Sequence, residues 1–197
     1  GAKKAEKTGY EPVIRRKEPS NRAKFSQLIL ENIQYIINRH PDYLSTGEYS
    51  LLLKISSLTC KYYNKLVNYQ KRTGYGFKST AQNTNISQIS DFINESRSCV
   101  SKKINSLIEK GIIIEDDENS IEDNNRKVKE LPLYMNPEIC YQGNRNKIYG
   151  KLCRYVKRND RLEQNGINLP WKIWIEGNKK HGKLIRRETY LKKQSEI

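Results

Sequence analysis

The most constraining feature of this sequence is the stretch from Asn85 to Ile114, which has the pattern of two short helices around a tight turn. Ser96 is placed to cap the second helix with its hydroxyl, and Gly111 is placed to end it. The pattern predicts a helix-turn-helix followed by a strand over Ile112–Ile114. Apolar residues recur at helical spacing on both sides of the turn, at Ile86, Ile89, Phe92, Ile93, Val100, Ile104, Leu107 and Ile108.

The second predicted helix, residues 97–110, carries a polar face in its first turns. In a recognition helix, the N-terminal residues are the ones that reach base edges in the major groove. We therefore expect this helix to contact DNA, and the alternative is an ordinary helical hairpin with a solvated polar face. The expected contacts on and beside the helix are Ser96, Arg97, Ser98, Ser101, Lys102 and Asn105.

The charge of the chain favours DNA binding over the hairpin alternative. The formal net charge is +15, from 37 Lys and Arg against 22 Asp and Glu. A field of this sign attracts a polyanion such as DNA, RNA or an anionic membrane. Both ends are basic, with net charges of +5 over residues 1–24 and +10 over residues 141–197, and an acidic segment of net charge −5 lies over residues 111–140.

The composition divides the chain into three parts. Residues 1–24 predict a flexible basic arm, residues 25–156 a domain of helices with a small β-wing, and residues 157–197 a basic extension. The extension contains one apolar cluster, and the sequence leaves open whether this cluster docks on the domain, binds a partner or pairs between subunits. Its members are Leu169, Trp171, Ile173, Trp174 and Ile175.

Two helices are expected before the helix-turn-helix. The apolar stripe over Phe25–Arg39 predicts the first, and His40-Pro41 ends it. Ser45 and Glu48 have the spacing of a capping box and open the second, which is apolar almost all round and runs to about Cys60. Residues 61–80 leave two structures open, a continued helix or a hairpin.

A two-stranded wing is expected after the helix-turn-helix, over residues 112–115 and about 126–134. The tip between the strands is acidic, so we expect it to point away from DNA. The basic residues at its base are expected to reach the DNA backbone, and they are Arg126, Lys127 and Lys129. A helical turn beginning at Pro137 and a helix from Gly143 to Val156 should follow.

Several of these segments together resemble a known family. The residues that carry the resemblance are Ile89–Asn94, Ser96–Ser98, Val100–Lys102, Leu107–Ile113 and Leu133–Glu138, the last reading Leu-Tyr-Met-Asn-Pro-Glu. Residues 45–139 resemble winged-helix proteins of the MarR-like kind, and they are most similar to the RepL-type replication initiators of plasmids from Gram-positive bacteria. Glu95 departs from the family pattern, because such turns usually carry a small apolar residue, and it predicts a turn that opens toward solvent.

The resemblance implies a winged helix-turn-helix in the α+β class, mainly α, and a protein that binds a plasmid or phage-like origin and starts its replication. A transcriptional regulator or a plasmid partition protein would use the same DNA contacts, so both remain alternatives. The implied partners are double-stranded DNA, a second copy of the chain, and replication or partition proteins. The stripe on residues 25–37 and the helix after Gly143 are the candidate dimer interfaces.

No enzymatic activity is expected. A nicking initiator with a tyrosine nucleophile needs a metal held by a close histidine pair, and the chain has only His40 and His181. No phosphate-binding loop, catalytic carboxylate pair or nucleophile–histidine pattern is present. The cysteines, at positions 60, 99, 140 and 153, lack metal-ligand spacing, so no metal or cofactor is expected. We expect a cytoplasmic protein associated with the nucleoid or a plasmid, without a membrane partner, because no apolar run approaches roughly 20 residues.

Overall fold

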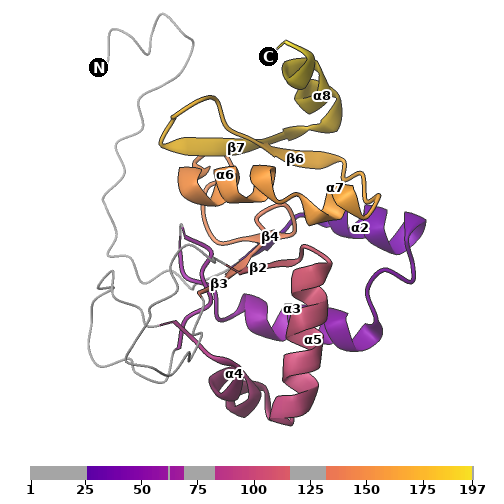
Figure 1. Cartoon of the computed structure of the whole chain (residues 1–197), viewed down its shortest axis with the longest axis vertical. Helices are drawn as coiled ribbons and strands as arrows, with labels where there is room; N and C mark the ends of the chain where they lie inside the picture. The colour runs from indigo at the N-terminus through magenta and orange to yellow at the C-terminus, as the bar shows by residue number, and fades with distance from the viewer. Residues whose placement is uncertain (1–25, 62, 69–82, 116–131, 197) are drawn as a thin grey trace, which may run out of the picture.

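The computed structural model describes residues 26–61, 63–68, 83–115 and 132–196, and it combines helices with small antiparallel sheets (Figure 1). This agrees with the predicted α+β class. The elements in chain order are β1 (Gln27–Leu28), α2 (Leu30–Arg39), α3 (Thr46–Ser56), α4 (Ile86–Ile93), α5 (Arg97–Glu109), β2 (Ile113–Glu115), β3 (Leu133–Met135), β4 (Cys140–Tyr141), β5 (Ile148–Tyr149), α6 (Gly150–Arg158), α7 (Arg161–Gln164), β6 (Trp171–Trp174), β7 (His181–Arg186) and α8 (Arg187–Ser195).

Helices α4 and α5 form the predicted pair, and local sequence explains their ends. The Asn85 side chain accepts a hydrogen bond from the backbone N–H of Gln88, and the Gln88 side chain accepts one from the backbone N–H of Asn85. Asn94 ends α4 in the left-handed conformation, with φ of 55°. The Ser96 hydroxyl accepts from the Cys99 N–H at the start of α5, as predicted. Gly111 ends that helix with φ of +73°, a conformation that favours glycine.

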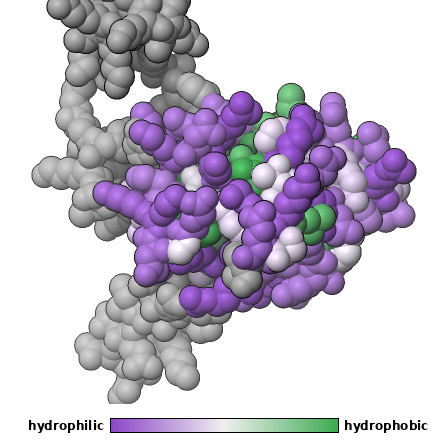
Figure 2. Space-filling view, turned by 90° about the horizontal axis from the view of Figure 1, so that it is seen from above, coloured by the Kyte–Doolittle hydropathy of each residue, from purple (hydrophilic) through white to green (hydrophobic). Residues whose placement is uncertain are grey.

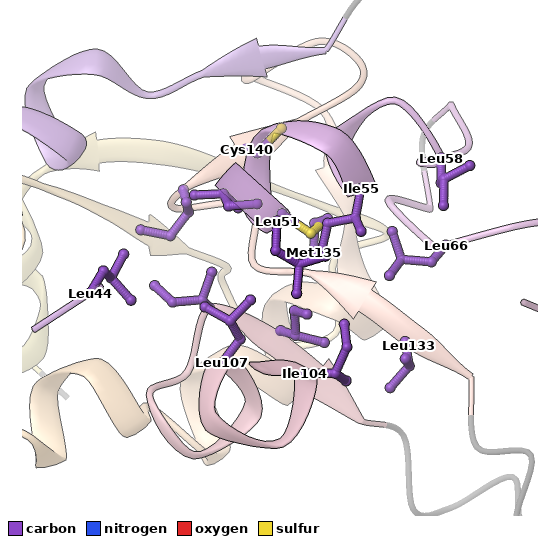
Figure 3. Close-up of a cluster of buried hydrophobic side chains, with 14 of the residues drawn as sticks. Leu44, Leu51, Ile55, Leu58, Leu66, Ile104, Leu107, Leu133, Met135 and Cys140 are labelled. Carbon is purple, nitrogen blue, oxygen red and sulfur yellow. The ribbon is translucent and has the colours of Figure 1, made fainter. Parts of the chain in front are cut away.

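The first core lies between α3, α5 and the β2–β3 hairpin (Figure 3). Leu51 and Ile55 of α3 belong to the same cluster as Leu107 of α5, and all three side chains are fully buried. The predicted capping box between Ser45 and Glu48 is confirmed. However, α3 ends at Ser56, earlier than expected. Residues 65–67 instead form isolated bridges, to Tyr134, Thr59 and Asn83 in turn, so no helix continues there.

Two further expectations about the first core need correction. The first helix does not begin at Phe25, because Gln27 and Leu28 pair with Tyr141 and Cys140 as a short antiparallel sheet. Phe92 was expected on the buried face of α4, but it is 47 % exposed. Beyond these, the β2–β3 pairing joins Ile113 to Met135 and follows the predicted hairpin in its described part.

The second core is built by residues near the C-terminus. Strands β5, β7 and β6 form an antiparallel sheet, with α6 and α8 packed against it. The helix expected from Gly143 begins only at Gly150, because Ile148 and Tyr149 pair with Gly182 and His181 of β7. The apolar cluster of the C-terminal region docks on the chain itself, which is the first of the three alternatives, since Leu169 joins the first core and Ile173 the second.

Some expectations concern residues outside the described ranges. They include the basic arm at residues 1–24, the acidic wing tip, and the wing-base contacts Arg126, Lys127 and Lys129. Most of residues 61–80 also falls there. Among the described residues, no helix has the length and apolar character that crossing a membrane requires.

Candidate nucleic-acid interface

The residues predicted to contact DNA lie on the outward side of α5, which we call the recognition face. Arg97, Ser98, Lys102 and Asn105 are exposed, and Ser101 is half-buried. The opposite side of the helix is anchored, because Val100, Ile104 and Leu107 are buried in the first core. Together with Ser96 at the cap, the six predicted contact residues lie within the cap and the first turns of this helix. The packing therefore fixes which side of α5 faces outward.

Glu95 in the turn before α5 holds three helices together. Its carboxylate accepts from Lys54 of α3 at 2.8 Å and from Lys103 of α5 at 2.6 Å. Hydrogen bonds from these two lysines, with Lys103 contributing most, lower the pKa of Glu95 to about 2. The expectation that this turn opens toward solvent is therefore wrong, because Glu95 closes it as an ion-paired clamp.

Glu48 forms a second clamp at the other end of α5. Its side chain is 5 % exposed, and it accepts from Lys110 at 2.8 Å and from Ser106 at 2.6 Å while it completes the capping box with Ser45. Burial acts to raise the pKa of Glu48, but the hydrogen bonds from Lys110, Ser106 and Ser45 together lower it to about 2. We call α3, α4 and α5 with these two glutamates the three-helix unit.

The two clamps leave the recognition face positively charged. Lys54, Lys103 and Lys110 are each neutralised by a carboxylate of the same unit. Arg97 and Lys102 make no ion pair with any group in the described part of the chain. Their charges point outward from a helix whose orientation is fixed on the opposite side. Such a surface can bind phosphates and base edges without first breaking internal contacts.

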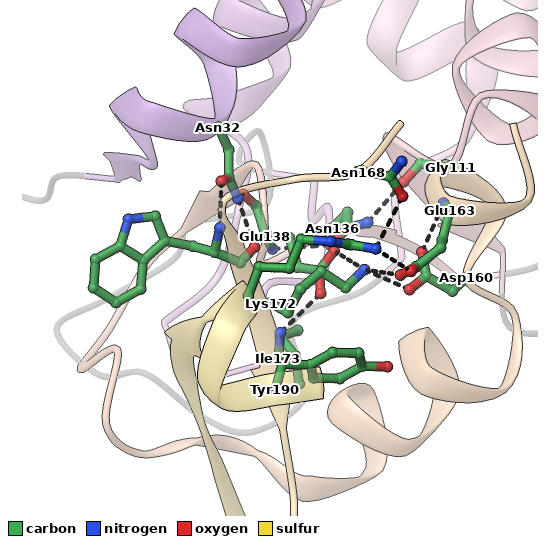
Figure 4. A network of polar contacts seen from close by, with 12 residues as sticks. Asn32, Gly111, Asn136, Glu138, Asp160, Glu163, Asn168, Lys172, Ile173 and Tyr190 are labelled. Carbon is green, nitrogen blue, oxygen red and sulfur yellow. Dashed lines mark hydrogen bonds and ion pairs between the residues drawn. The ribbon is translucent and has the colours of Figure 1, made fainter. Parts of the chain in front are cut away.

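A different network holds the C-terminal part to the rest of the molecule (Figure 4). Lys172 of β6 is 1 % exposed, and its ammonium group lies 3.1 Å from Glu138 and 3.3 Å from Glu163 and also contacts Asp160. Burial would lower the pKa of Lys172, but Glu138 and Asp160 reverse this and raise it, so the lysine stays charged. Burial raises the pKa of Glu138 to about 7 even beside this lysine.

The Met-Asn-Pro-Glu segment that carries the family resemblance is a structural junction. Asn136 donates to the carbonyl of Gly111 at 2.8 Å and accepts from the Glu138 N–H at 2.9 Å. Glu138 also accepts from the Ile173 N–H at 2.8 Å. This segment therefore connects the end of α5 to β6 through buried hydrogen bonds. The Asn136 contact lies at the C-terminal end of α5, at Gly111.

The residues considered for metal binding or catalysis do not gather into a site. Cys60, Cys140 and Cys153 are buried, and burial raises the pKa of Cys140 to about 11 and of Cys153 to about 12, which disfavours the reactive thiolate. His40 lies against Tyr35, with ring centroids 5.6 Å apart, and His181 is exposed on β7. Within the described ranges, no three His, Cys, Asp or Glu side chains are grouped as metal ligands.

Sequence reasoning missed three features of the site. The two glutamate clamps join different helices, and Lys54 and Lys110 lie 41 and 62 residues from their carboxylates, so spacing within one helix does not reveal them. The buried role of Lys172 was also missed, although its place between Trp171 and Ile173 in an apolar cluster was a signal. Third, lysines from α6, β7 and α8 converge on Trp174, where Lys157 and Lys193 lie 4.7 and 5.6 Å from the ring centroid.

Comparisons with known proteins leave the family undetermined. No family model matches the chain, and no solved structure matches it. The chain is 26 % identical over 134 residues to an uncharacterised 23.6 kDa protein of Bacillus thuringiensis. That match covers 68 % of this chain and 60 % of the relative, so the chain spans less than two thirds of the relative's length.

Proposed function

We propose that this protein binds double-stranded DNA in a sequence-specific manner and that α5 is the recognition helix of a winged helix-turn-helix. The observation that carries the proposal is the outward face of α5, where Arg97 and Lys102 have no acidic partner among the described residues. The glutamate clamps on the other side of the helix support it, because they preorganise this face. Preorganisation reduces the ordering cost of binding.

Each residue on the face has a chemical role in this proposal. The guanidinium of Arg97 makes paired hydrogen bonds to a guanine, and the amide of Asn105 does the same for an adenine. Ser96, Ser98 and Ser101 donate to phosphates near the start of the helix, where the unpaired backbone N–H groups also favour an anion. Lys102 adds a salt-dependent phosphate contact.

The hairpin of β2 and β3 is the wing in this proposal. It follows α5 directly, and Glu95 and Glu48 fix the helix from which it leaves. Arg126, Lys127 and Lys129, at the base of the predicted wing, supply further contacts to the DNA backbone. These contacts position the protein without reading sequence.

The biological role proposed is initiation of replication at the origin of a plasmid or phage-like element. The resemblance of residues 45–139 to RepL-type initiators supports it. Transcriptional regulation and plasmid partition remain the alternative, because the same DNA contacts serve all three roles. The uncharacterised relative from Bacillus thuringiensis does not separate them.

Selection of bound fragments from the source genome tests the function. The purified protein is incubated with sheared genomic DNA, and fragments that remain bound at about 0.15 M salt are sequenced. A site within an origin is the expected result, whereas a promoter or a repeat array would identify regulation or partition. Enrichment of no fragment over the Arg97→Ala variant would contradict the proposal. Competition with double-stranded RNA of the same sequence tests whether the protein prefers DNA to RNA.

A second copy of the chain is the proposed protein partner, and it contacts the outward stripe of α2. Leu30 is 64 % exposed and Ile37 is 49 % exposed on one side of this helix. The other candidate, α6, uses its apolar face within its own chain, since Leu152 and Val156 lie in the second core. Sedimentation should show a dimer for the natural chain and a monomer for Leu30→Glu/Ile37→Glu. A monomer both free and on DNA would contradict it.

A further inference from the structure

The part of the molecule formed by α6, β6, β7 and α8, which we call the C-terminal unit, has a strongly basic surface. Residues 151–197 contain 13 Lys and Arg against 5 Asp and Glu. Two of those five carboxylates are used internally, because Asp160 and Glu163 contact Lys172, and Glu163 also pairs with Arg187 at 2.6 Å. The cations that remain on the surface are therefore opposed by few acids.

Three of these cations come together around Trp174. Lys157 of α6 lies 4.7 Å and Lys193 of α8 5.6 Å from the centroid of its ring. Lys183 of β7 is directly opposite Trp174 in the β6–β7 register, so its side chain leaves the same face of the sheet. We call Lys157, Lys183 and Lys193 the lysine cluster. Three elements of the fold bring them together.

The lysine cluster is short of negative charge. Glu176 is the carboxylate beside it, and it contacts Lys179 and lies 3.7 Å from Lys193. Neither Lys157 nor Lys183 makes an ion pair in the described part of the chain. Like charges held together repel one another, and a phosphate between them removes that repulsion. The fold thus maintains an arrangement that an anion stabilises.

The chemistry of the surface indicates which anion it binds. Lysine ammonium groups act as point charges and bind phosphate without the planar geometry that reads bases. Two arginines of this unit are engaged within the chain, because Arg186 lies over Trp171 and pairs with Glu31, and Arg187 pairs with Glu163. Seen from this end, the described surface is mainly hydrophilic with small apolar patches, unlike the apolar face of a membrane-inserting helix (Figure 2). A phosphate backbone fits these features.

The position of the C-terminal unit separates it from the recognition face. Helices α4 and α5 lie at one end of the molecule, and β7 and α8 lie at the opposite end (Figure 1). A straight duplex that follows α5 therefore does not also reach the lysine cluster. We propose that the C-terminal unit is a second, sequence-independent surface for the DNA backbone, so that one protein molecule holds a second duplex while α5 reads the first. The inference rests on the proposed function for the first duplex.

A two-duplex capture assay tests the proposal with the full chain. A duplex that carries the selected site is fixed to beads and loaded with protein, and a fluorescent duplex without the site is added. The natural protein should retain the second duplex. Lys157→Gln/Lys183→Gln should retain at least about tenfold less, while its affinity for the first duplex changes by less than about threefold. The slope of log affinity for the second duplex against log salt should fall by about 2, because each lost phosphate contact contributes about 0.9.

The charge-matched control is Arg39→Gln/Lys61→Gln, which removes two exposed cations from α2 and from the segment after α3. This control should capture the second duplex like the natural chain. Unchanged capture by Lys157→Gln/Lys183→Gln would overturn the proposal, as would retention of RNA or of phosphatidylserine vesicles in place of duplex DNA. Equal thermal midpoints would show that both variants are folded.

The assay also separates this proposal from the proposed function. Arg97→Ala should release the site-bearing duplex at about 0.15 M salt but leave binding of the fluorescent duplex to the free protein unchanged. If Arg97→Ala has no effect and Lys157→Gln/Lys183→Gln abolishes binding of the fluorescent duplex, the proposed function fails and the second surface stands.

Discussion

The three-helix unit and the C-terminal unit are both held by ion pairs between lysines and carboxylates, but the two units arrange these charges in opposite ways. In the three-helix unit, the carboxylates are central: Glu95 binds Lys54 and Lys103, and Glu48 binds Lys110. In the C-terminal unit, the ammonium of Lys172 is central, and three carboxylates surround it. In both units these carboxylates are paired within the chain, while other lysines and arginines remain exposed.

The two arrangements differ in how deeply the charges are buried. Lys172 and Glu138 are each 1 % exposed, whereas Lys54 and Glu95 are 40 % and 23 % exposed. Water screens the exposed pair and can solvate either partner alone, so its loss costs little. A buried partner left alone cannot be solvated. The buried ion pairs of Lys172 therefore hold the C-terminal unit firmly in place. The exposed ion pair between Lys54 and Glu95 only orients the recognition face.

Removal of Lys172 should give the largest effect on stability. Lys172→Ala leaves Glu138 and Asp160 without their cation, and we expect the free energy of unfolding to fall by about 3–5 kcal/mol. Urea unfolding followed by the fluorescence of Trp171 and Trp174 measures it. The matched control is Lys179→Ala, which removes a lysine paired with a carboxylate on the surface. A loss below about 1 kcal/mol for Lys172→Ala would remove the distinction between the two units.

Glu48→Gln should have an intermediate effect, because Glu48 is buried but its partner Lys110 is 27 % exposed. The amide keeps the shape and part of the hydrogen bonding, while the charge is lost. We expect a decrease of about 2 kcal/mol in the free energy of unfolding, since hydrogen bonds to charged groups contribute about 1.5–3 kcal/mol. The same urea titration measures it. A decrease as large as that for Lys172→Ala would show that burial of both partners does not determine the loss in the free energy of unfolding.

Acid should weaken the three-helix unit through the two glutamate clamps. Their pKa values are about 2 in the folded chain, compared with an ordinary value of 4.5, so their contribution is complete above about pH 4.5 and is lost as the pH falls toward 2. The pKa of Glu138 in the folded chain is about 7, so this carboxyl is already protonated in the folded state when the pH enters this range. Unfolding free energies at pH 5, 4 and 3 should fall less steeply for Glu48→Gln/Glu95→Gln than for the natural chain. Parallel curves would contradict this assignment.

Glu95→Gln should give the smallest change in stability, below about 1 kcal/mol, because exposed ion pairs contribute little. Its effect should instead be seen on DNA. Without the clamp, α5 is less well oriented, and affinity for the selected site should fall several-fold, as measured by fluorescence anisotropy. Glu109→Gln, which removes an exposed carboxylate at the far end of α5, is the control. Equal affinities for the two variants would show that the clamp does not orient the helix.

Local signals in the sequence were sufficient to predict α4 and α5 and the start of α3, but not the glutamate clamps between them. Capping residues, a left-handed Asn94 and a terminating Gly111 act within a few residues of the helix that they define. The predicted span of 97–110 for α5 differs by one residue from the observed Arg97–Glu109. The exposure of the polar residues on the first turns of α5 follows from the same periodicity, whereas their contact with DNA stays a prediction.

Contacts between distant segments were not predictable in this way. Ile148 has the spacing of a helical residue, but its pairing with Gly182 makes it a strand residue. Glu138 was interpreted only as part of the segment that resembles a known family, and its partner Lys172 lies 34 residues further along the chain. Glu95 was expected to open the turn, because Lys54 and Lys103 could not be placed beside it without the tertiary structure. Each of these errors comes from an interaction that sequence periodicity does not encode.

The affinity of the Arg97→Ala variant for the selected duplex, relative to a scrambled duplex, tests the central claim most directly. The control is Arg39→Ala, which removes an exposed arginine from α2, away from α5. We predict that Arg97→Ala lowers affinity for the selected duplex by at least about tenfold, since a paired arginine–guanine contact contributes about 1–3 kcal/mol of discrimination, while Arg39→Ala changes it by less than about threefold. Affinity for the scrambled duplex should change little. An unchanged ratio between selected and scrambled duplexes in Arg97→Ala would contradict the claim that α5 reads DNA.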